Sequence, residues 1–244
     1  MELKQDISFN MQLFYLPKLS KSDKIAEFDK EESKHLYKVL RKDIGDKLNI
    51  TNGLNYFFEA SINSISKSHC KVDIEKVIKD TPLSYSLHIA ISPLKSMERF
   101  EWFLEKSSEI GISEITPIVC DRTEKKYIND KRLRKVLISA MKQSLKSHLP
   151  KLNPIISLKE FIKNDFKDDL FIAHCDKFKK EPLLNSINAK SSNLILIGPE
   201  GDFSQKEIET ISSLGFKNVS LGDSRFRTET AGIIACHTVS IVNM

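Results

Sequence analysis

Residues 197–204 read Ile-Gly-Pro-Glu-Gly-Asp-Phe-Ser, and residues 221–231 read Leu-Gly-Asp-Ser-Arg-Phe-Arg-Thr-Glu-Thr-Ala. Each stretch follows a short apolar run and leads into a segment of helical length. Glycine lets a ligand approach the backbone closely and proline stiffens a turn, so both stretches suit a loop between a buried strand and a helix. They predict a ligand site, and a pair of ordinary structural turns is the equal alternative at this point.

Apolar runs alternate with helical segments on both sides of these loops. Strands are predicted at Leu87–Ile91, Ile115–Val119, Leu170–Ala173, Leu194–Ile197 and Val219–Leu221. Helices are predicted at Glu98–Ile110, Lys131–Lys146, Ser204–Leu214 and Glu229–Val242. Ser204 with Glu207 forms a capping box, and Gly215 ends that helix. This alternation is typical of a parallel α/β sheet, in which ligands bind beyond the carboxyl ends of the strands.

The N-terminal third has a different pattern, and Thr81-Pro82 marks the break. Residues 11–80 are β-rich, with strands predicted at Lys47–Thr51, Tyr56–Ile62 and Cys70–Val77. Asn52-Gly53 provides a hairpin turn between the first two strands. One helix is predicted near Ser33–Leu40, and these elements together indicate a small barrel.

The spacing of the glycines and cysteines excludes several common sites. No two of the eight glycines are separated by a single residue, so the Gly-x-Gly-x-x-Gly dinucleotide fingerprint is absent. The phosphate-binding P-loop, the Gly-x-Ser-x-Gly elbow and the His-Glu-x-x-His pair are absent as well. The four cysteines lie at widely separated positions, 70, 120, 175 and 236, which leaves no local Cys-x-x-Cys motif. We predict that no metal is bound.

Charge points to a different class of partner. The formal net charge is +5, and residues 121–151 contain ten Lys or Arg against three Asp or Glu. This local excess of positive charge favours a phosphate-binding surface over a merely solvated helix face.

The sequence holds no apolar run of about 18 residues, so no membrane span is predicted. The polar start lacks the apolar region of a secretory signal, which favours a cytoplasmic protein.

Five motifs in order resemble the ribosomal RNA small subunit methyltransferase E family. They are Met11–Tyr15; His35–Arg41 followed by Gly45-Asp46; Lys95–Gly111; Gln143-Ser144 followed by Pro150; and the two loops at 197–204 and 221–231. The resemblance covers about residues 11–244. It implies an α/β protein in which residues 81–244 form a SPOUT domain with a deep trefoil knot. Residues 1–80 would form a PUA-like β-barrel that helps to bind RNA, with residues 1–10 expected to be a disordered extension.

The resemblance also implies an activity. The expected reaction is the S-adenosylmethionine-dependent methylation of N-3 of a uridine in 16S ribosomal RNA of the small subunit, by a cytoplasmic homodimer. One alternative is a SPOUT methyltransferase that acts on another RNA or another position. A second alternative, of a different class, is a non-catalytic RNA-binding dimer.

Residues of the family motifs carry over to this chain by position. The cofactor-binding set is Ile197, Gly198, Pro199, Glu200, Gly201, Leu221, Gly222, Phe226, Arg227, Thr228, Thr230 and Ala231. The RNA-binding set is Arg41, Lys95, Arg99, Arg122, Lys142, Gln143 and Lys146. Three positions depart from the family pattern: Asp202 replaces a second glycine, Arg225-Phe226 replaces an apolar pair, and Lys146 replaces an arginine.

Arg227 and Glu229 are the candidate catalytic residues. Loss of the N-3 proton of uracil spreads negative charge onto the flanking carbonyl oxygens, which a guanidinium at Arg227 would stabilise. The alternative for Arg227 is a structural salt bridge to Glu229 or Glu200. Glu229 is expected to act as a base or to orient Arg227. Its alternative is a favourable interaction with the helix dipole and no chemistry.

Overall fold

The computed structural model describes residues 12–176 and 179–244. The predicted extension at 1–10 lies outside the described residues. The described chain divides into two compact units, one ending at Pro82 and the other beginning at Leu83. Residues 141–149 pack with the first unit, although the sequence assigned them to the C-terminal domain. The domain limits 1–80 and 81–244 stay a prediction.

The first unit contains a five-stranded sheet in the order β1-β3-β4-β5-β2. Its elements are β1 (Leu13–Tyr15), β2 (Ile25–Phe28), α1 (Lys30–Lys34), the π-helix η1 (His35–Val39), β3 (Lys47–Thr51), β4 (Tyr56–Ile65) and β5 (Cys70–Lys79). The three strands predicted from the sequence are confirmed as β3, β4 and β5. The strands β1 and β2 were not predicted, because three or four residues are too few to show an alternating pattern. Phe14, Phe58 and Ile50 lie in the core of this unit.

The helix predicted near Ser33–Leu40 begins earlier and changes type. Asp29 caps it, since its carboxylate accepts from the backbone N–H of Glu32. The α-helical turn then continues as η1, a rare conformation that often occurs at functional positions. Arg41 follows with a positive φ of 51°.

The turn between β3 and β4 explains why residues 141–149 belong to this unit. The N–H of Leu149 donates to the carbonyl of Gly53 (3.0 Å), and the N–H of Asn55 donates to the carbonyl of Ser147 (3.0 Å). The Ser147 hydroxyl also donates to the Asp80 carboxylate (2.6 Å). The hairpin predicted at Asn52-Gly53 is therefore anchored by a segment far away in the sequence.

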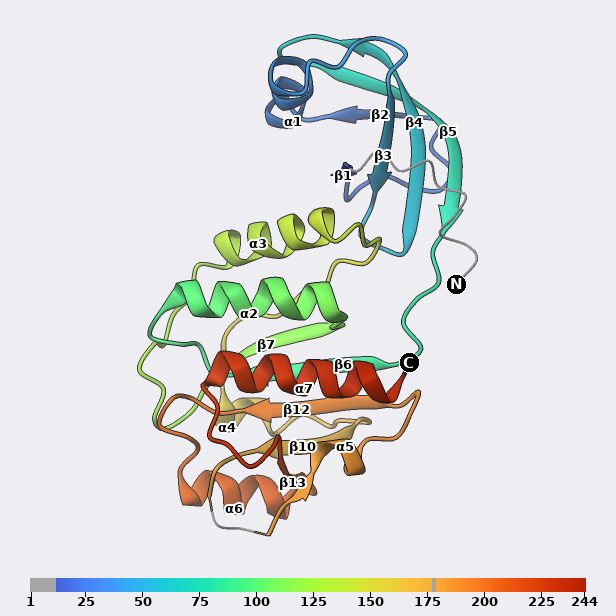
Figure 1. Cartoon of the computed structure of the whole chain (residues 1–244). Helices are drawn as coiled ribbons and strands as arrows, with labels where there is room; N and C mark the ends of the chain where they lie inside the picture. Colours follow the sequence, from blue (N-terminus) through green and yellow to red (C-terminus); the bar gives the residue numbers. More distant parts are fainter. Residues whose placement is uncertain (1–11, 177–178) are drawn as a thin grey trace. The chain divides into compact units, whose positions relative to one another are not determined.

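The second unit is built on a wholly parallel sheet in the order β11-β13-β10-β12-β6-β7-β8, with β9 also paired to β7 (Figure 1). Its strands are β6 (Ser86–Ile91), β7 (Glu114–Val119), β8 (Lys151–Leu152), β9 (Ile156–Ser157), β10 (Asp169–Ala173), β11 (Glu181–Pro182), β12 (Ser192–Ile197) and β13 (Lys217–Ser220). Its helices are α2 (Met97–Ile110), α3 (Asp130–Gln143), α4 (Leu158–Phe161), α5 (Leu183–Ser186), α6 (Gln205–Ser213) and α7 (Thr228–Val242). The parallel sheet predicted from the alternation of strands and helices is confirmed.

Helices pack on both faces of this sheet. Adjacent strand residues point to opposite faces, so Ala90 and Ile91 mark the two sides. Ala90 belongs to a core with residues of α4 and α6. Ile91 faces α7, where a Cβ on Gly232 would lie 3.1 Å from the Ile91 side chain and 2.6 Å from the Phe103 ring of α2. The glycine thus permits α7 to lie close against α2 and β6.

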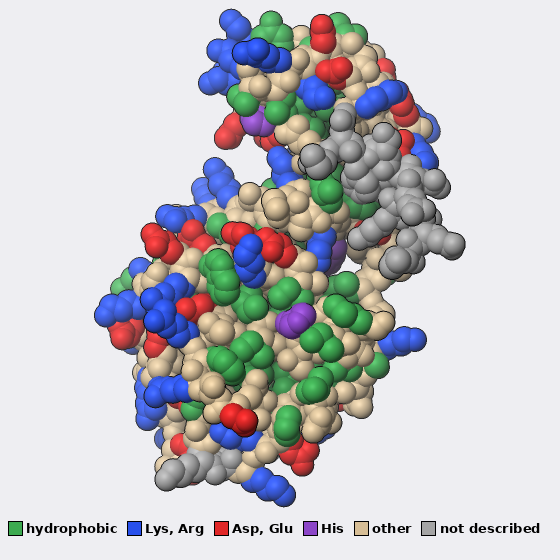
Figure 2. Space-filling model, viewed as in Figure 1, with side chains coloured by type: hydrophobic (Ala, Val, Ile, Leu, Met, Phe, Trp, Pro, Cys, Tyr) green, Lys and Arg blue, Asp and Glu red, His purple; other side chains and the backbone are tan. Residues whose placement is uncertain are grey.

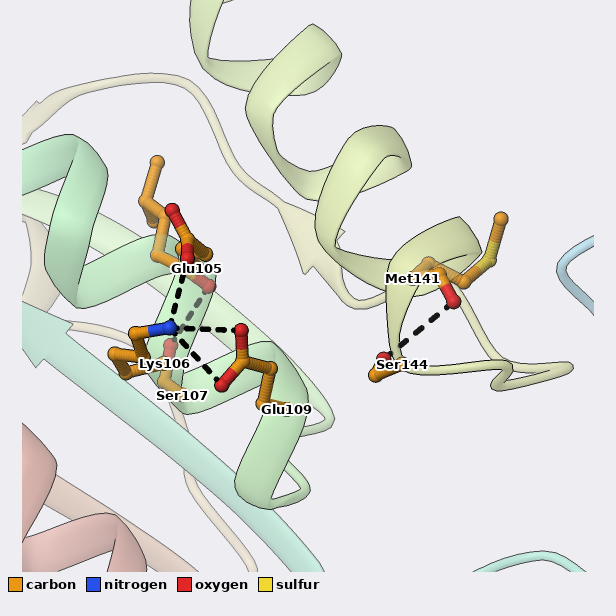
Figure 3. A network of polar contacts seen from close by, with 7 residues as sticks. Glu105, Lys106, Ser107, Glu109, Met141 and Ser144 are labelled. Carbon is orange, nitrogen blue, oxygen red and sulfur yellow. Dashed lines mark hydrogen bonds and ion pairs between the residues drawn. The ribbon is translucent and has the colours of Figure 1, made fainter. Parts of the chain in front are cut away.

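Helix α3 ends earlier than predicted, at Gln143 and not at Lys146. The N–H of Lys146 donates to the carbonyl of Met141 (3.0 Å) and the N–H of Leu145 to that of Lys142 (3.3 Å). Leu145 has a φ of 53°, so these bonds form a left-handed helix end of the Schellman type. Figure 3 shows the Ser144 hydroxyl directed back to the Met141 carbonyl.

On α2, Lys106 lies between Glu105 and Glu109, as Figure 3 also shows. The hydrogen bonds that the Lys106 ammonium donates to these carboxylates, Glu105 first, raise the pKa of Lys106 above its ordinary value. In the part of the chain that the structure describes, no helix combines the length and apolar character needed to cross a membrane.

Candidate active site

Three loops meet at the carboxyl edge of the parallel sheet. The strands β12 and β13 both pair with β10, so the segments after Ala173, Ile197 and Ser220 emerge side by side. Together they enclose a cavity of about 650 Å³. Small-molecule sites occupy roughly 300–1,000 Å³, so the cavity is large enough for a nucleoside-sized ligand.

The two stretches singled out in the sequence form most of this cavity. It is lined by Ala173, His174, Cys175, Lys180, Ile197, Gly198, Pro199, Glu200, Asp202, Ser220, Leu221, Gly222, Asp223, Ser224, Arg225, Phe226, Arg227, Thr228 and Ala231. Every predicted cofactor residue is among them except Gly201 and Thr230. The structure therefore brings the two loops together into one concave site.

The loop at 198–204 is held from three directions. The Thr228 hydroxyl donates to the Gly198 carbonyl (3.0 Å), so Thr228 connects the loops and does not cap α7 with its side chain. The Arg122 guanidinium donates to the Gly201 carbonyl (2.8 Å). The Glu200 carboxylate accepts from the backbone N–H of Lys95 (3.0 Å). The loop is thus fixed by contacts from distant segments before any ligand is bound.

Asp202 adds a fourth contact and explains a departure from the family pattern. Its N–H donates to the Pro199 carbonyl (2.9 Å) in a tight turn, and its φ is 64°, a conformation that aspartate tolerates better than most residues. Its carboxylate accepts from the backbone N–H of Cys175 (2.7 Å) and of Phe203 (2.8 Å). Aspartate therefore adopts the glycine-like conformation and joins the loop after β12 to the loop after β10.

The cavity residues at the end of β10 and just after it were not predicted from the sequence. The cavity is also lined by Ala173, His174 and Cys175. One indication of this was present in the sequence, because a strand of the same parallel sheet was predicted to end at Ala173. His174 Nε2 lies within hydrogen-bond distance (2.9 Å) of the Asn218 amide oxygen. Burial lowers the pKa of His174, although the Asn218 contact opposes the change. Burial therefore favours the neutral form of this imidazole.

The two candidate catalytic residues, Arg227 and Glu229, have different surroundings, and only Arg227 lines this cavity. Arg227 is exposed, lines the cavity and makes no ion pair within the described chain. Glu229, whose side chain is 8% exposed, lies 3.8 Å from the Nε of Arg99. Glu229 thus pairs with Arg99 and not with Arg227, so the alternative of a structural salt bridge from Arg227 to Glu229 is not observed in the described chain.

The predicted RNA-binding residues have varied surroundings. In the first unit, Lys142 contacts Glu32 (3.3 Å) and lies over the Phe14 ring, while Gln143 is exposed. In the second unit, Lys95 contacts Glu124 (3.2 Å). Arg122 holds the loop at 198–204, as described above. Arg41 is exposed, and Lys146 lies just beyond α3. Contact with RNA stays a prediction for each of them.

Among the described residues, no three His, Cys, Asp or Glu side chains cluster as metal ligands would.

Family models match both parts of the chain. Residues 81–240 match a model described as an RNA methyltransferase domain, and residues 28–75 match an RNA methyltransferase PUA domain. The predicted fold class, a SPOUT-type α/β domain preceded by a PUA-like domain, is thereby confirmed. The trefoil knot itself stays a prediction.

Individual relatives cover nearly the whole chain. The ribosomal RNA small subunit methyltransferase E of Buchnera aphidicola is 33% identical over 217 residues, 85% of either chain. A solved structure of a probable rRNA methyltransferase from Porphyromonas gingivalis is 37% identical, with a TM-score of 0.88 over 95% of this chain and 98% of that one. A ribosomal RNA small subunit methyltransferase E from Neisseria gonorrhoeae, solved bound to S-adenosylmethionine, is 26% identical, with a TM-score of 0.81 over 96% and 98%. The chain therefore belongs to the ribosomal RNA small subunit methyltransferase E family.

Proposed function

We propose that the protein is an S-adenosylmethionine-dependent methyltransferase that modifies N-3 of a uridine in 16S ribosomal RNA of the small subunit. The observation that carries this proposal is the cavity between the loops at 198–204 and 221–227, found in a chain of this family. The Neisseria relative is solved with S-adenosylmethionine bound. The same cofactor in this cavity is the simplest assignment.

The residues of the cavity fit such a cofactor. Gly198 and Gly222 line the cavity without a side chain, and Gly222 has a positive φ of 145°. We assign the backbone of Gly198, Leu221, Gly222 and Phe226 to adenine and ribose, with Ile197 as an apolar wall. Ala231 is assigned to a second apolar wall. When bound, the cofactor contributes an electrophilic methyl group on a sulfonium.

The chain must align the target nitrogen and help its proton to leave. Uracil N-3 is protonated at neutral pH, and its loss of a proton places charge on the two neighbouring carbonyl oxygens. We assign Arg227 to these oxygens, because its guanidinium has no ion pair in the described chain and lines the cavity. Glu229 is assigned to hold Arg99 in place, since the two groups are 3.8 Å apart.

Partners and location follow from the same proposal. The substrate is 16S ribosomal RNA, free or within the small subunit, so we place the protein in the cytoplasm, where bacterial ribosomes are assembled. We also propose a homodimer. Figure 2 shows hydrophobic side chains gathered over α2 and α7, and Ile241 of α7 is 48% exposed. An apolar patch of this kind is typical of a protein interface.

The decisive test uses small subunits that lack the modification. They are incubated with the protein and cofactor carrying a labelled methyl group, and the labelled nucleoside is then identified and mapped. We expect 3-methyluridine at one position of 16S ribosomal RNA. Label on a ribose or on another base would reassign the enzyme to another position, and cofactor binding without label in the subunit would reassign it to another RNA. Absence of both cofactor binding and label would favour a non-catalytic RNA-binding dimer.

A further inference from the structure

A second cavity adjoins the one assigned to the cofactor. It has a volume of about 630 Å³ and is lined by Glu98, Arg99, Trp102, Arg225, Phe226, Arg227, Glu229 and Thr230. Arg225, Phe226 and Arg227 line both cavities, so this short segment is their common wall. A methyl transfer requires donor and acceptor to lie within about 3–3.5 Å and in line, which only adjoining sites allow.

Trp102 gives this second cavity an aromatic surface. It lies on α2 outside the buried stripe of Phe100, Phe103 and Leu104, and 44% of it is exposed. The indole is therefore not part of the packed core of the second unit. Its flat face suits the stacking of a nucleobase, which contributes about 1–3 kcal/mol per base in proteins that bind single-stranded nucleic acid.

The polar groups around Trp102 match the edge of a uracil. That edge presents two carbonyl acceptors on either side of the N-3 proton. Arg99 and Arg227 bring guanidinium donors to the cavity, and Thr230 brings a hydroxyl. Glu229 keeps Arg99 in place, whereas Arg227 has no ion pair in the described chain. Cytosine presents an amino group in place of one carbonyl. A guanidinium placed to donate to that carbonyl would then face another hydrogen-bond donor.

We propose that the target uracil occupies this second cavity, stacked on Trp102 and held at its carbonyl edge by the arginines. The proposal rests on the proposed function, because it needs the cofactor in the first cavity. A third cavity, lined by Lys125 and the 73% exposed Tyr127, shares no residue with the first and does not meet that requirement. Trp102 is a substrate-contacting residue in this assignment.

The chain itself provides the reporter. Trp102 is its only tryptophan, so intrinsic indole emission reports on this cavity alone. With S-adenosylhomocysteine saturating the first cavity, we expect the trinucleotide UUU to quench the emission and to bind at least fivefold more tightly than CCC. Equal quenching by both trinucleotides, or none by either, would overturn the assignment. This readout needs no methyl transfer, so it can succeed or fail independently of the proposed activity.

Turnover on small subunits gives the second test. We expect Trp102→Ala to raise KM for the subunit about tenfold, as expected for a lost stacking contact, with cofactor affinity unchanged. Trp102→Phe, which keeps an aromatic face, should recover most of the loss. Tyr127→Ala removes an exposed aromatic residue outside the cavity and should leave KM unaltered. A wild-type KM in Trp102→Ala, or a change in its oligomeric mass by light scattering, would overturn the proposal in favour of a structural or subunit contact.

Discussion

Arg227 is the residue on which the proposed chemistry depends most. We expect Arg227→Ala to lower kcat by about 100-fold, the usual effect of removing a donor that stabilises a developing oxyanion. Binding of S-adenosylhomocysteine, measured by calorimetry, should change little, because the cofactor is assigned to backbone groups of the loops. Arg227→Lys keeps the charge but loses the planar fork, so its kcat should be intermediate. Unchanged turnover in the alanine variant would remove Arg227 from the mechanism.

Gly222 and Gly201 form a matched pair within the cofactor loops. Gly222 has a φ of 145°, which side chains other than glycine rarely adopt, so Gly222→Ala should cost about 1–3 kcal/mol of local strain. Gly201 has no such conformation, and a Cβ there would meet Arg122 at an ordinary 3.4 Å. We expect S-adenosylhomocysteine affinity to fall clearly in Gly222→Ala and to stay near wild type in Gly201→Ala. Equal effects would show that the φ of Gly222 does not shape the site.

Some of these residues could be found from the sequence and others could not. The loop glycines can be recognised in the sequence because few residue types permit such turns. Their position after apolar runs places them at a sheet edge. The role of Asp202 could not be inferred, since its partner, the N–H of Cys175, is 27 residues away. Trp102 was missed as well. Its position outside the apolar stripe of α2 was the available sign.

At the scale of elements, the contact between α7 and α2 is set by Gly232. Alanine normally stabilises a helix by about 1 kcal/mol relative to glycine. Here the added Cβ would lie 2.6 Å from the fully buried Phe103 ring, and overpacking of this kind costs about 1–3 kcal/mol. We therefore expect Gly232→Ala to lower the free energy of unfolding by about 1 kcal/mol, measured by urea denaturation. Increased stability would mean that α7 can move away from α2.

His88 on β6 makes the stability of the parallel sheet depend on pH. Burial lowers its pKa and outweighs the opposing charges of Glu114 and Asp168, while Lys151 lowers it further. A histidine with a lowered folded pKa contributes stability that is complete above its unfolded value, about 6.5, and is lost as the pH falls below that value.

The test compares the parent protein with His88→Gln, which cannot become charged but can still bond to Thr116, the present partner of Nε2 at 2.7 Å. Urea denaturation from pH 7.5 to 5.5 should show a smaller loss of unfolding free energy in the variant. The test depends on how much the unfolding free energy changes between the two pH values. A variant that is less stable by the same amount at every pH would not bear on it. An identical loss in both proteins would exclude His88 as a source of the pH dependence.

The elements also show how far sequence patterns reach. The alternation of apolar runs and helical segments predicted the parallel sheet, because each strand is buried on both faces and each helix on one. The order β11-β13-β10-β12-β6-β7-β8 was beyond reach, since it depends on crossovers between distant segments. The end of α3 was misplaced because Leu145, which no pattern marks as a stop, adopts the left-handed conformation that usually needs glycine.

At the scale of the whole molecule, the proposed substrate is far larger than either cavity. Ribosomal RNA presents phosphates over a wide surface, and the candidate cations are distributed over both units, with Arg41 and Lys142 in the first and Lys95 and Arg99 in the second. Several of them are already engaged by carboxylates. Exposed cations outside this set, at the start of α3, are therefore the better test of phosphate contact.

Lys131 and Lys135 are exposed on α3, whereas Arg134 between them donates to the Leu152 carbonyl (3.0 Å) and Arg132 pairs with Glu101. Each phosphate contact adds about 0.7–0.9 to the slope of log affinity against log salt. Charge reversal at Lys131 and Lys135 should therefore weaken RNA binding at low salt and reduce this slope by about 1.5.

The matched control reverses Lys159 on α4 and Lys206 on α6, which are also exposed and change the net charge equally. Long-range electrostatics alone would affect both double variants alike, because net charge acts on the whole field around the protein. Direct phosphate contact at α3 predicts a reduced slope only in the Lys131 and Lys135 variant. Equal slopes in the two variants would reject α3 as the RNA surface. The basic residues of α3 would then be ordinary solvent-exposed charges.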